Sequence, residues 1–256
     1  KVAARYARAW AGLHQWATAV SNPEAKWAVS ALPTGVQFQP VWVDKIAPSM
    51  LKAREKVIIM SATLLSKDMV CGLYGLDPDD VEWVSSKSPF PVANRPLYYY
   101  PVTRMRFGVD EGELREAVLH TAREHQGERG LVHTVSYKRG GEIAAVLRAA
   151  ALRVEVITHS AKDREAALAR YIATPGSILV SPSMHPGVGL PHALCRWQTI
   201  CKLPFPDMRD PLVKAMTADT SHELRGERGM LYDTAVTLDP TYGRGVRAED
   251  DWCDTR

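Results

Sequence analysis

The 256-residue chain contains only four cysteines, and no two of them have the CxxC spacing. Zinc and iron–sulfur centres usually draw ligands from such pairs, so the spacing argues against a metal centre within this chain. No disulfide framework is indicated, and we expect a reducing, cytoplasmic compartment. Because no run approaches 18 apolar residues and no signal peptide opens the chain, we expect no association with a membrane.

Two nucleotide-binding signatures are also missing. The sequence has neither a GxxxxGK[ST] loop nor a DEAH-like acidic box. The first of these is the element that cradles the phosphates of a nucleotide. The chain alone is therefore not expected to bind ATP in the usual way. It begins with Lys1 rather than Met, and we expect a fragment, the C-terminal part of a longer polypeptide.

The charge balance says little about partners. The net charge is +3, and the hydrophobic fraction of 46% and the charged fraction of 24% are those of an ordinary globular protein. The 32 basic residues comprise 21 Arg and 11 Lys. An arginine excess suits phosphate recognition, because the guanidinium donates bidentately. A GC-rich genome explains the same excess equally well.

The first hundred residues combine helix, strand and linker signals. Residues 1–21 carry an apolar stripe that predicts an amphipathic helix, which either packs on a core or binds a partner. Short strands are expected at 27–31 and 36–43, and a buried strand at Lys56–Met60. Four prolines interrupt residues 85–101, so this segment is expected to lack regular structure and to act as a linker.

From residue 110 onward, predicted helices and strands alternate. The pattern predicts helices at 111–126, 141–151 and 162–173, and strands at 130–135, 154–158, 177–180 and 197–203. This alternation is typical of an α/β fold with a parallel sheet covered on both faces. Such sheets bind ligands beyond the carboxyl ends of their strands, so functional groups are expected there.

Six short motifs follow one another along the chain. They are residues 59–64 (IMSATL), 90–96 (FPVANRP), 130–137 (GLVHTVSY), 178–191 (ILVSPSMHPGVGLP), 196–205 (RWQTICKLPF) and 242–247 (YGRGVR). Their order resembles the second half of a superfamily 2 DNA helicase of the XPD/DinG type, over residues 27–252. The resemblance implies a RecA-like parallel sheet with helices on both faces, forming a complete second motor lobe after the end of the first.

The resemblance also implies a division of the chain into four parts. Residues 1–22 would be a helix that returns from an inserted domain, and residues 23–84 the end of the first RecA-like lobe. Residues 85–108 would be a proline-rich linker between the lobes. Residues 109–256 would form the second RecA-like lobe.

In the family, the SAT motif couples the state of ATP to the grip on DNA. Ser61 and Thr63 are therefore implied coupling residues, although a strand that runs into a hydroxyl turn is the alternative. Gly187, Gly189 and Gly243 belong to the same implied set, because glycines let the backbone approach a ligand closely. The family commonly has Asp where this chain has Gly189, so a carboxylate expected at the lobe interface is absent.

A track for single-stranded DNA is implied on the second lobe. Small hydroxyls and main-chain N–H groups at strand ends can donate to phosphates without base preference. Tyr137 is alternatively a lobe-packing residue, and His159 a plain loop histidine. The implied DNA-binding residues are Ser136, Tyr137, Thr158, His159, Ser181 and Ser183.

Arg244 and Arg247 match the two arginines of the last family motif, which is a helix. At a spacing of three they would share one helical face and stabilise the charge of a transferred phosphoryl group. A surface arginine pair is the alternative. The family's Gln, which orients the attacking water, aligns with Pro240. This proline either interrupts the helix or, with Asp239 as its cap, starts a new one.

Three hypotheses for function are open at this point. In the first, the chain and the upstream half of the same helicase form an ATP-dependent translocase that moves 5′ to 3′ on single-stranded DNA. ATP and Mg²⁺ would be bound mainly by the upstream lobe, and any iron–sulfur cluster would also lie upstream. In the second, Gly189 and Pro240 mark an ATP-hydrolysis-deficient DNA-binding or assembly module. In the third, the chain is an unrelated α/β domain. DNA repair, phage replication complexes and CRISPR effector complexes are all open as settings.

Overall fold

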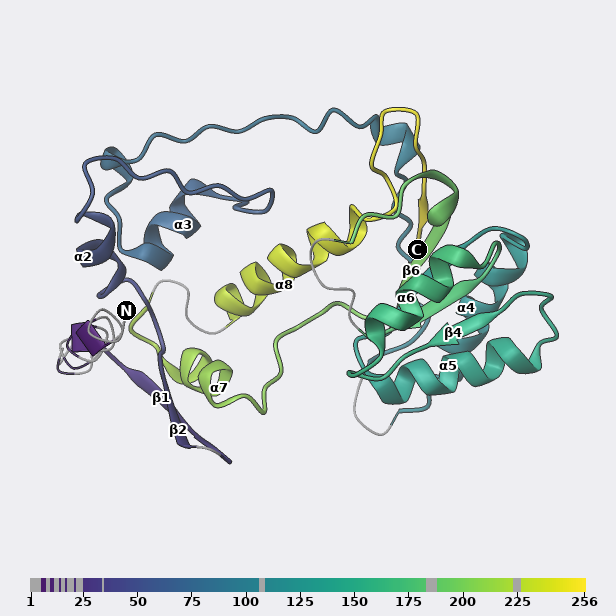
Figure 1. Ribbon diagram of the computed structural model, residues 1–256, viewed down its shortest axis with the longest axis horizontal. Helices are drawn as coiled ribbons and strands as arrows, with labels where there is room; N and C mark the ends of the chain where they lie inside the picture. The colour runs from purple at the N-terminus through teal and green to yellow at the C-terminus, as the bar shows by residue number, and fades with distance from the viewer. Residues whose placement is uncertain are drawn as a thin grey trace. The chain divides into compact units, whose positions relative to one another are not determined.

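The chain folds as two compact units, which are described separately below (Figure 1). The first comprises residues 1–85 and 205–236, and the second residues 86–204 and 237–256. The computed structural model describes residues 25–33, 35–105, 109–182, 188–222 and 227–256, together with seven separate positions before residue 22. In this part of the chain, no helix has the length and apolar character needed to cross a bilayer.

The described helices and strands are the following. The helices are α2 (Ala47–Leu51), α3 (Lys67–Tyr74), α4 (Gly112–Glu124), α5 (Tyr137–Ala149), α6 (Arg164–Ala173), α7 (Pro211–Ala218) and α8 (Glu227–Tyr242). Short 3₁₀ turns are η1 (Pro78–Asp80), η2 (Val92–Asn94) and η3 (His192–Leu194). The strands are β1 (Trp27–Leu32), β2 (Gly35–Pro40), β3 (Gly130–His133), β4 (Val156–Thr158), β5 (Ile178–Ser181), β6 (Trp197–Ile200) and β7 (Asp254–Thr255).

The first unit is built on the antiparallel hairpin of β1 and β2. Ala28 of β1 packs with Val41 and Trp42 against apolar side chains of α3 and α7. Asp219, just after α7, accepts a hydrogen bond of 3.0 Å from the indole Nε1 of Trp42 and one of 2.7 Å from the ammonium of Lys26. These contacts fasten the segment 205–236 to the hairpin.

The predicted buried strand at Lys56–Met60 is wrong. The segment has no regular secondary structure, and the side chains of Ile58 and Met60 are 83% and 86% exposed. A strand of this apolar composition needs neighbours in a covered sheet. The only strands in the described part of the first unit, β1 and β2, pair with each other.

Most of the predicted helix at residues 1–21 lies outside the described residues. Its described positions include Tyr6 and Trp10, which are helical. Their side chains are 72% and 74% exposed. The role of this helix, in packing or in partner binding, stays open.

The second unit contains a five-stranded sheet in the order β4-β5-β3-β6-β7, and all its strand pairs are parallel. The side chains of Val132 and Val180 point to one face, where they pack with α4 and α5. Leu131 and Leu179 point to the other face, where they pack with Tyr171 of α6. The predicted α/β fold, with a parallel sheet covered on both faces, is confirmed.

Helix α5 begins four residues earlier than predicted, at Tyr137. The hydroxyl of Ser136 accepts a hydrogen bond from the backbone N–H of Arg139 and so caps the helix. Gly140 therefore lies inside the first turn of α5, whereas the predicted helix would have begun after it. A Cβ atom at this position would lie 3.2 Å from the hydroxyl oxygen of Thr134, so the close approach of helix to strand favours glycine.

The end of helix α8 differs from both alternatives considered for Pro240. The helix runs without interruption from Glu227 to Tyr242 with Pro240 inside it. Because the proline lies near the C-terminal end, only the last turn has to tolerate it. Arg244 and Arg247 lie beyond the helix, so the prediction that they share a helical face is wrong.

The proline-rich segment has more backbone pairing than its composition predicts. The carbonyl of Pro96 accepts a hydrogen bond of 3.2 Å from the N–H of Thr255, and the N–H of Tyr98 donates to the Thr255 carbonyl at 2.8 Å. Proline lacks a donor but keeps its acceptor, so it fits at the edge of a sheet. Residues 96–98 thus cover the edge strand β7. The role of residues 85–108 as a linker between lobes, like the proposed lobes themselves, stays a prediction.

Candidate functional site

Three of the implied DNA-binding residues meet at the carboxyl ends of neighbouring strands in the second unit. The ring centroids of Tyr137 and His159 are 6.0 Å apart, and the rings are nearly perpendicular at 85°. The Nε2 atom of His159 lies 2.8 Å from the hydroxyl oxygen of Ser181. The sheet therefore brings together side chains that follow β3, β4 and β5.

The hydrogen bonds of His159 define its neutral tautomer. Its Nδ1 atom lies 2.8 Å from the carbonyl oxygen of Ser160, which can only accept. In the neutral ring Nδ1 therefore carries the proton, and Nε2 accepts from the hydroxyl of Ser181. His159 is 9% exposed and Ser181 is fully buried. These two buried residues therefore support the exposed residues of the site and do not form its surface.

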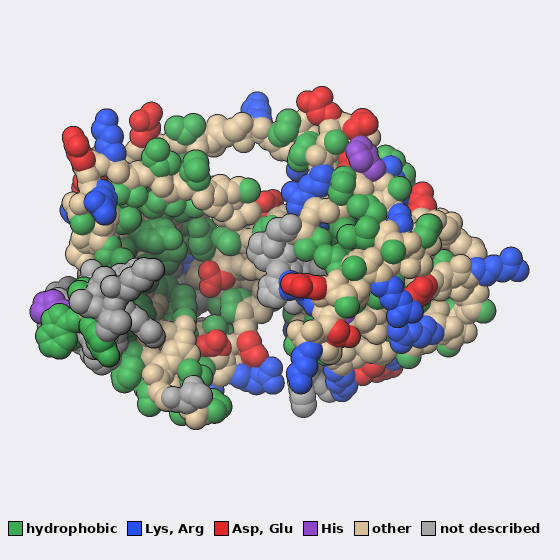
Figure 2. All heavy atoms as spheres, in the orientation of Figure 1, with side chains coloured by type: hydrophobic (Ala, Val, Ile, Leu, Met, Phe, Trp, Pro, Cys, Tyr) green, Lys and Arg blue, Asp and Glu red, His purple; other side chains and the backbone are tan. Residues whose placement is uncertain are grey.

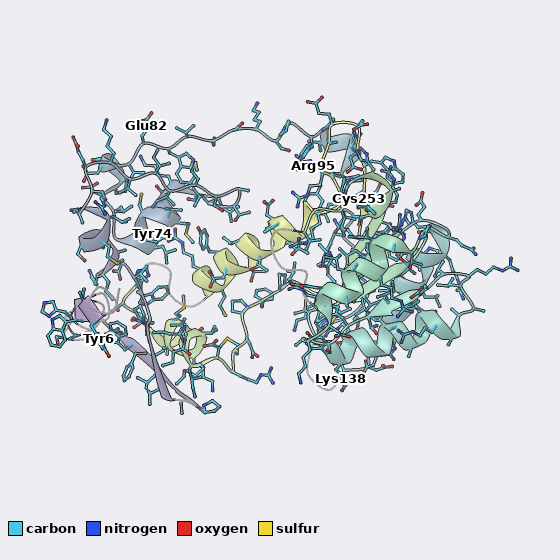
Figure 3. The ribbon with its side chains drawn as sticks, viewed as in Figure 1. Tyr6, Tyr74, Glu82, Arg95, Lys138 and Cys253 are labelled. Carbon is cyan, nitrogen blue, oxygen red and sulfur yellow. The ribbon has the colours of Figure 1, made fainter. Side chains whose placement is uncertain are left out.

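The surface of this edge is formed by other residues. Tyr137 is 50% exposed, and Thr158 is exposed with its hydroxyl 3.3 Å from the guanidinium of Arg148. Lys138, in the first turn of α5 (Figure 3), has 88% of its side chain exposed, and its Nζ atom lies 4.0 Å from a carboxylate oxygen of Glu142. Ser136 caps α5 with its hydroxyl. Ser183 and Gly187 lie outside the described residues.

A strained residue directs the chain from β3 into α5. Val135 has φ of +63°, a left-handed conformation that is rare for a β-branched side chain. Such strain costs on the order of 1–3 kcal/mol and is concentrated at functional sites. The turn allows Ser136 to cap the helix and presents Tyr137 next to His159. Neither the strain nor its place was evident from the sequence pattern.

A cavity of about 970 Å³ adjoins this edge at the start of α5. Arg139 donates to Glu111 through Nε and Nη2, both at 2.6 Å, and through Nη1 to the Thr134 carbonyl at 2.7 Å. The bonds from Arg139 lower the pKa of the Glu111 carboxyl. Lys138 and Lys202 also line the cavity. These residues were not singled out from the sequence. The pattern that could have indicated them is the pair of basic residues that closely follows the hydroxyl of Ser136.

On one face of the second unit, the charges are mixed rather than gathered into one patch. On the face shown in Figure 2, Lys and Arg side chains of this unit lie among Asp and Glu side chains. This agrees with the small net charge of +3.

The two implied catalytic arginines lie in different environments. Arg244 is 2% exposed, and its Nη1 donates to the carbonyl of Val188 at 2.9 Å. Burial is the main cause that lowers its pKa, and the neighbouring charge of Arg247 adds to it. The side chain of Arg247 is exposed, and its guanidinium makes no ion pair with any described carboxylate. Arg244 thus holds the backbone at Val188, while the side chain of Arg247 is exposed.

The glycines of this region have distinct surroundings. A Cβ atom at Gly189 would lie 3.5 Å from the Nε atom of Arg247, an ordinary contact distance. A carboxylate at this position would therefore stand beside the Arg247 guanidinium. Gly245, by contrast, leaves no space for a side chain, because a Cβ atom there would lie 2.2 Å from the sulfur of Cys253. At Gly243 the nearest atom, the Asp239 carbonyl oxygen, would be 3.4 Å away.

The implied coupling residues Ser61 and Thr63 lie in the first unit. The hydroxyl of Ser61 accepts from the backbone N–H of Thr63 at 3.2 Å, and the two hydroxyl oxygens are also 3.2 Å apart. Ser61 is exposed, whereas Thr63 is buried. The backbone carbonyl of the next residue, Leu64, accepts from the Tyr232 hydroxyl at 3.2 Å. The motif is thus a compact hydroxyl turn, and its coupling role stays a prediction.

A buried polar network under the sheet edge was also missed. Nε2 of His133 lies 3.3 Å from the Gln198 carbonyl oxygen, and the Gln198 amide donates to Tyr242 and Thr255. Desolvation lowers the pKa of His133 to about 4. The network ties the end of α8 to β3, β6 and β7. Among the described residues, no group of three His, Cys, Asp or Glu side chains is placed to hold a metal ion.

The parallel sheet, with helices on both faces and polar groups gathered at its carboxyl edge, defines the second unit as an α/β domain. Residues 119–255 match the sequence profile of the helicase C-terminal domain family. This match spans more than half of the chain, and the chain belongs to that family. The resemblance to the C-terminal part of a helicase is thereby confirmed.

One solved structure, that of S. tokodaii Xpd4, is 18% identical to this chain, with a TM-score of 0.35. The match covers 56% of this chain and 28% of Xpd4. No curated protein matches the chain significantly.

Proposed function

We propose that the chain is the C-terminal part of an ATP-dependent helicase or translocase that acts on single-stranded DNA. The observation that carries this proposal is the cluster of Tyr137, His159 and Ser181 at the carboxyl edge of a parallel sheet in a helicase-family domain. A half-exposed aromatic ring offers a stacking surface for a base. The neighbouring Lys138 and Thr158 offer contacts to phosphate without base preference.

The role proposed for this chain in hydrolysis rests on Arg247. ATP with Mg²⁺ supplies the phosphoryl group, and an upstream lobe would hold most of the nucleotide. Arg247 fits a role toward the γ-phosphate because it is exposed and unpaired with any described carboxylate. A guanidinium placed there stabilises the charge of the transition state. Arg244 is assigned instead to holding the backbone at Val188. Movement from 5′ to 3′ is proposed from the family resemblance.

The test uses the longest natural polypeptide that contains this chain. ATP hydrolysis is measured with and without single-stranded DNA, for the natural protein, for Arg247→Ala and for Arg123→Ala. Arg123 is an exposed arginine on α4 and serves as the matched control. We expect stimulation by DNA and a loss of about a hundredfold or more in Arg247→Ala only. Absence of DNA stimulation together with an unchanged rate in Arg247→Ala overturns the proposal.

A second candidate function is a DNA-binding or assembly module that does not hydrolyse ATP. Gly189 leaves Arg247 without the carboxylate that the family commonly has beside it, and Pro240 replaces the Gln that orients water. The combined substitution Gly189→Asp and Pro240→Gln should then create DNA-stimulated hydrolysis. Brisk hydrolysis by the natural protein would exclude this candidate.

A further inference from the structure

The second unit contains a second cavity, which the proposed DNA track does not use. Its volume is about 550 Å³, and it lies between α4, β6, residues 97–105 and the end of α8. Small-molecule sites commonly measure roughly 300–1,000 Å³. We call this cavity the tyrosine pocket, because three consecutive tyrosines, Tyr98, Tyr99 and Tyr100, line it.

The walls of the tyrosine pocket suit a planar ring. The ring centroids of Tyr98 and Tyr100 are 6.5 Å apart, and their planes are inclined by 45°. Both rings remain about half exposed. Leu114 and Val118 of α4 also line the pocket and add apolar groups to its wall. Aromatic rings that are held in place but left uncovered offer their faces for stacking.

One polar group inside the pocket is unsatisfied. Thr199 of β6 is 7% exposed and lines the pocket, and its hydroxyl has no hydrogen-bond partner among the described residues. Leaving a buried hydroxyl without a partner is costly, and most buried polar groups in folded proteins avoid it. A hydroxyl both donates and accepts, but the Thr199 hydroxyl oxygen is itself buried, so a polar atom of a ligand bonds to it only when neighbouring side chains move aside.

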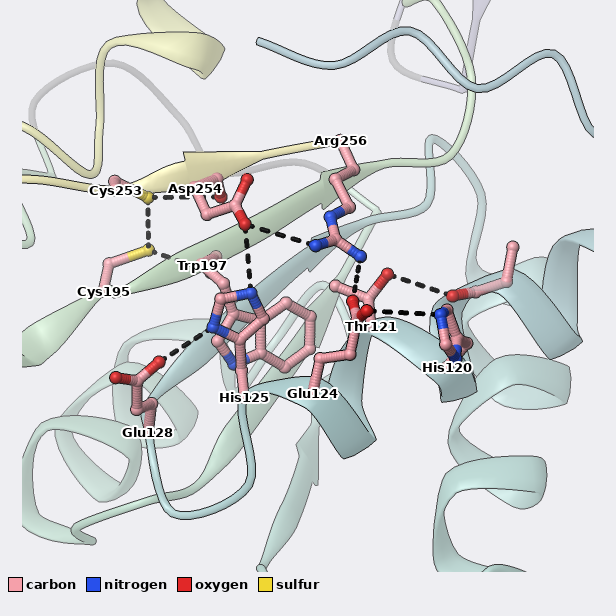
Figure 4. Close-up of polar contacts among 11 residues, drawn as sticks. His120, Thr121, Glu124, His125, Glu128, Cys195, Trp197, Cys253, Asp254 and Arg256 are labelled. Atoms are coloured by element: carbon pink, nitrogen blue, oxygen red, sulfur yellow. Dashed lines mark hydrogen bonds and ion pairs between the residues drawn. The ribbon is translucent and has the colours of Figure 1, made fainter. Parts of the chain in front are cut away.

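Two basic side chains of the pocket, Arg256 and Lys202, differ in whether they are already paired with a carboxylate. Arg256 is already neutralised, since it pairs with Glu124 and lies 3.4 Å from Asp254 (Figure 4). Its guanidinium also lies 5.8 Å from the centre of the Tyr100 ring, which it helps to hold. Lys202 lines this pocket as well as the first cavity, and it makes no ion pair with any carboxylate in the described part of the chain. An anionic group of a ligand would therefore be met by Lys202.

We propose that the tyrosine pocket binds one nucleoside monophosphate unit. The base stacks on Tyr98 and Tyr100, a polar atom of the ligand bonds to the hydroxyl of Thr199, and the phosphate reaches Lys202. The unit is a free mononucleotide or one residue of single-stranded DNA, which share this chemistry. The site is separate from the arginine-dependent step at Arg247 and does not require the chain to take part in ATP hydrolysis.

The test is calorimetric titration of the longest natural polypeptide with AMP and, separately, with a short single-stranded oligo(dA). Thr199→Val and Lys202→Ala are compared with the matched controls Thr217→Val and Lys214→Ala in the first unit. We expect each pocket variant to weaken binding about tenfold and the controls to bind as the natural protein does. Thr199→Val keeps the shape of the side chain and removes a hydroxyl without a described partner, so its melting temperature should not fall.

The two ligands distinguish the two sources of the nucleotide. Loss of AMP binding in the pocket variants identifies a free nucleotide site. Loss confined to oligo(dA) identifies a residue of the DNA strand. The inference is overturned if the natural protein binds neither ligand, or if both pocket variants bind like their controls. The hydrolysis assay with Arg247→Ala is independent, so failure of this site and failure of the proposed motor function can be told apart.

Discussion

Ser181 lies fully buried beneath the candidate DNA track, with its hydroxyl oxygen 2.8 Å from Nε2 of His159. His159 in turn packs nearly perpendicular to the Tyr137 ring. The hydroxyl therefore acts at a distance from any ligand, because it orients the imidazole on which the exposed ring rests. A serine that the sequence suggested as a DNA contact is better described as a positioning residue.

Replacing Ser181 by Ala should weaken the binding of single-stranded DNA by roughly threefold to tenfold, which corresponds to one lost hydrogen bond. Ser177→Ala is the matched control. Its hydroxyl is also fully buried and donates to the Thr174 carbonyl at 2.8 Å, but it lies at the amino end of β5. Fluorescence anisotropy with a labelled oligonucleotide measures the DNA affinity of both variants. Equal affinities in the two variants would show that Ser181 does not position His159.

Replacing Arg244 by Ala should lower the free energy of unfolding by about 2–4 kcal/mol, since it removes a buried side chain and its bond to the Val188 carbonyl. Arg247→Ala removes an exposed side chain and should change stability by no more than about 0.5 kcal/mol. Urea unfolding monitored by tryptophan fluorescence gives both values. Similar losses in the two variants would contradict the division of roles between these arginines.

Replacing Pro240 by Gln should stabilise helix α8. The proline ring crowds the carbonyl four residues earlier and removes one N–H from the helix interior. A gain of about 1 kcal/mol is expected, less than the full proline penalty of about 3 kcal/mol because the residue lies in the last turn. Thermal unfolding followed by circular dichroism is the measurement. A lower melting temperature would indicate that Pro240 is required for the end of the helix.

Protonation of His133 should weaken the fold in mild acid. Burial lowers its pKa to about 4 in the folded state from an ordinary value of 6.5. Between these values the unfolded chain binds more protons than the folded one, so stability falls as pH is lowered from 6.5 toward 4. The loss attributable to this group is about 3 kcal/mol. Urea titrations at several pH values, with His133→Leu as the comparison, should show a shallower pH dependence in the variant.

Much of the fold of the second unit was predictable, because its helices and strands are marked by patterns in the local sequence. Buried β-strands such as β3 and β5 read as continuous apolar runs, and the amphipathic period of α4 and α6 marks helices between strands. The start of α5 was less predictable, because Gly140 and Gly141 suggest a turn. It depends on the Ser136 cap and on the contact of Gly140 with Thr134.

The strand predicted at Lys56–Met60 failed for a related reason. Its apolar composition favours burial, but burial requires other strands beside it, and composition alone does not supply them. The structure instead leaves Ile58 and Met60 exposed. The local sequence pattern predicts that a segment favours a buried strand. Whether the strand forms depends on whether other strands lie beside it.

The sequence by itself determined the family, the alternation of helices and strands between residues 110 and 203, and the placement of polar residues at strand ends, since these depend on local periodicity and on motif order. The tertiary structure alone decided which of those residues face outward. Arg244 and Arg247 are three positions apart, yet one is buried against the Val188 carbonyl and the other is exposed. That difference arises because the helix ends at Tyr242 and Arg244 then bonds to the backbone of Val188 and Leu190, a long-range contact that no spacing rule contains.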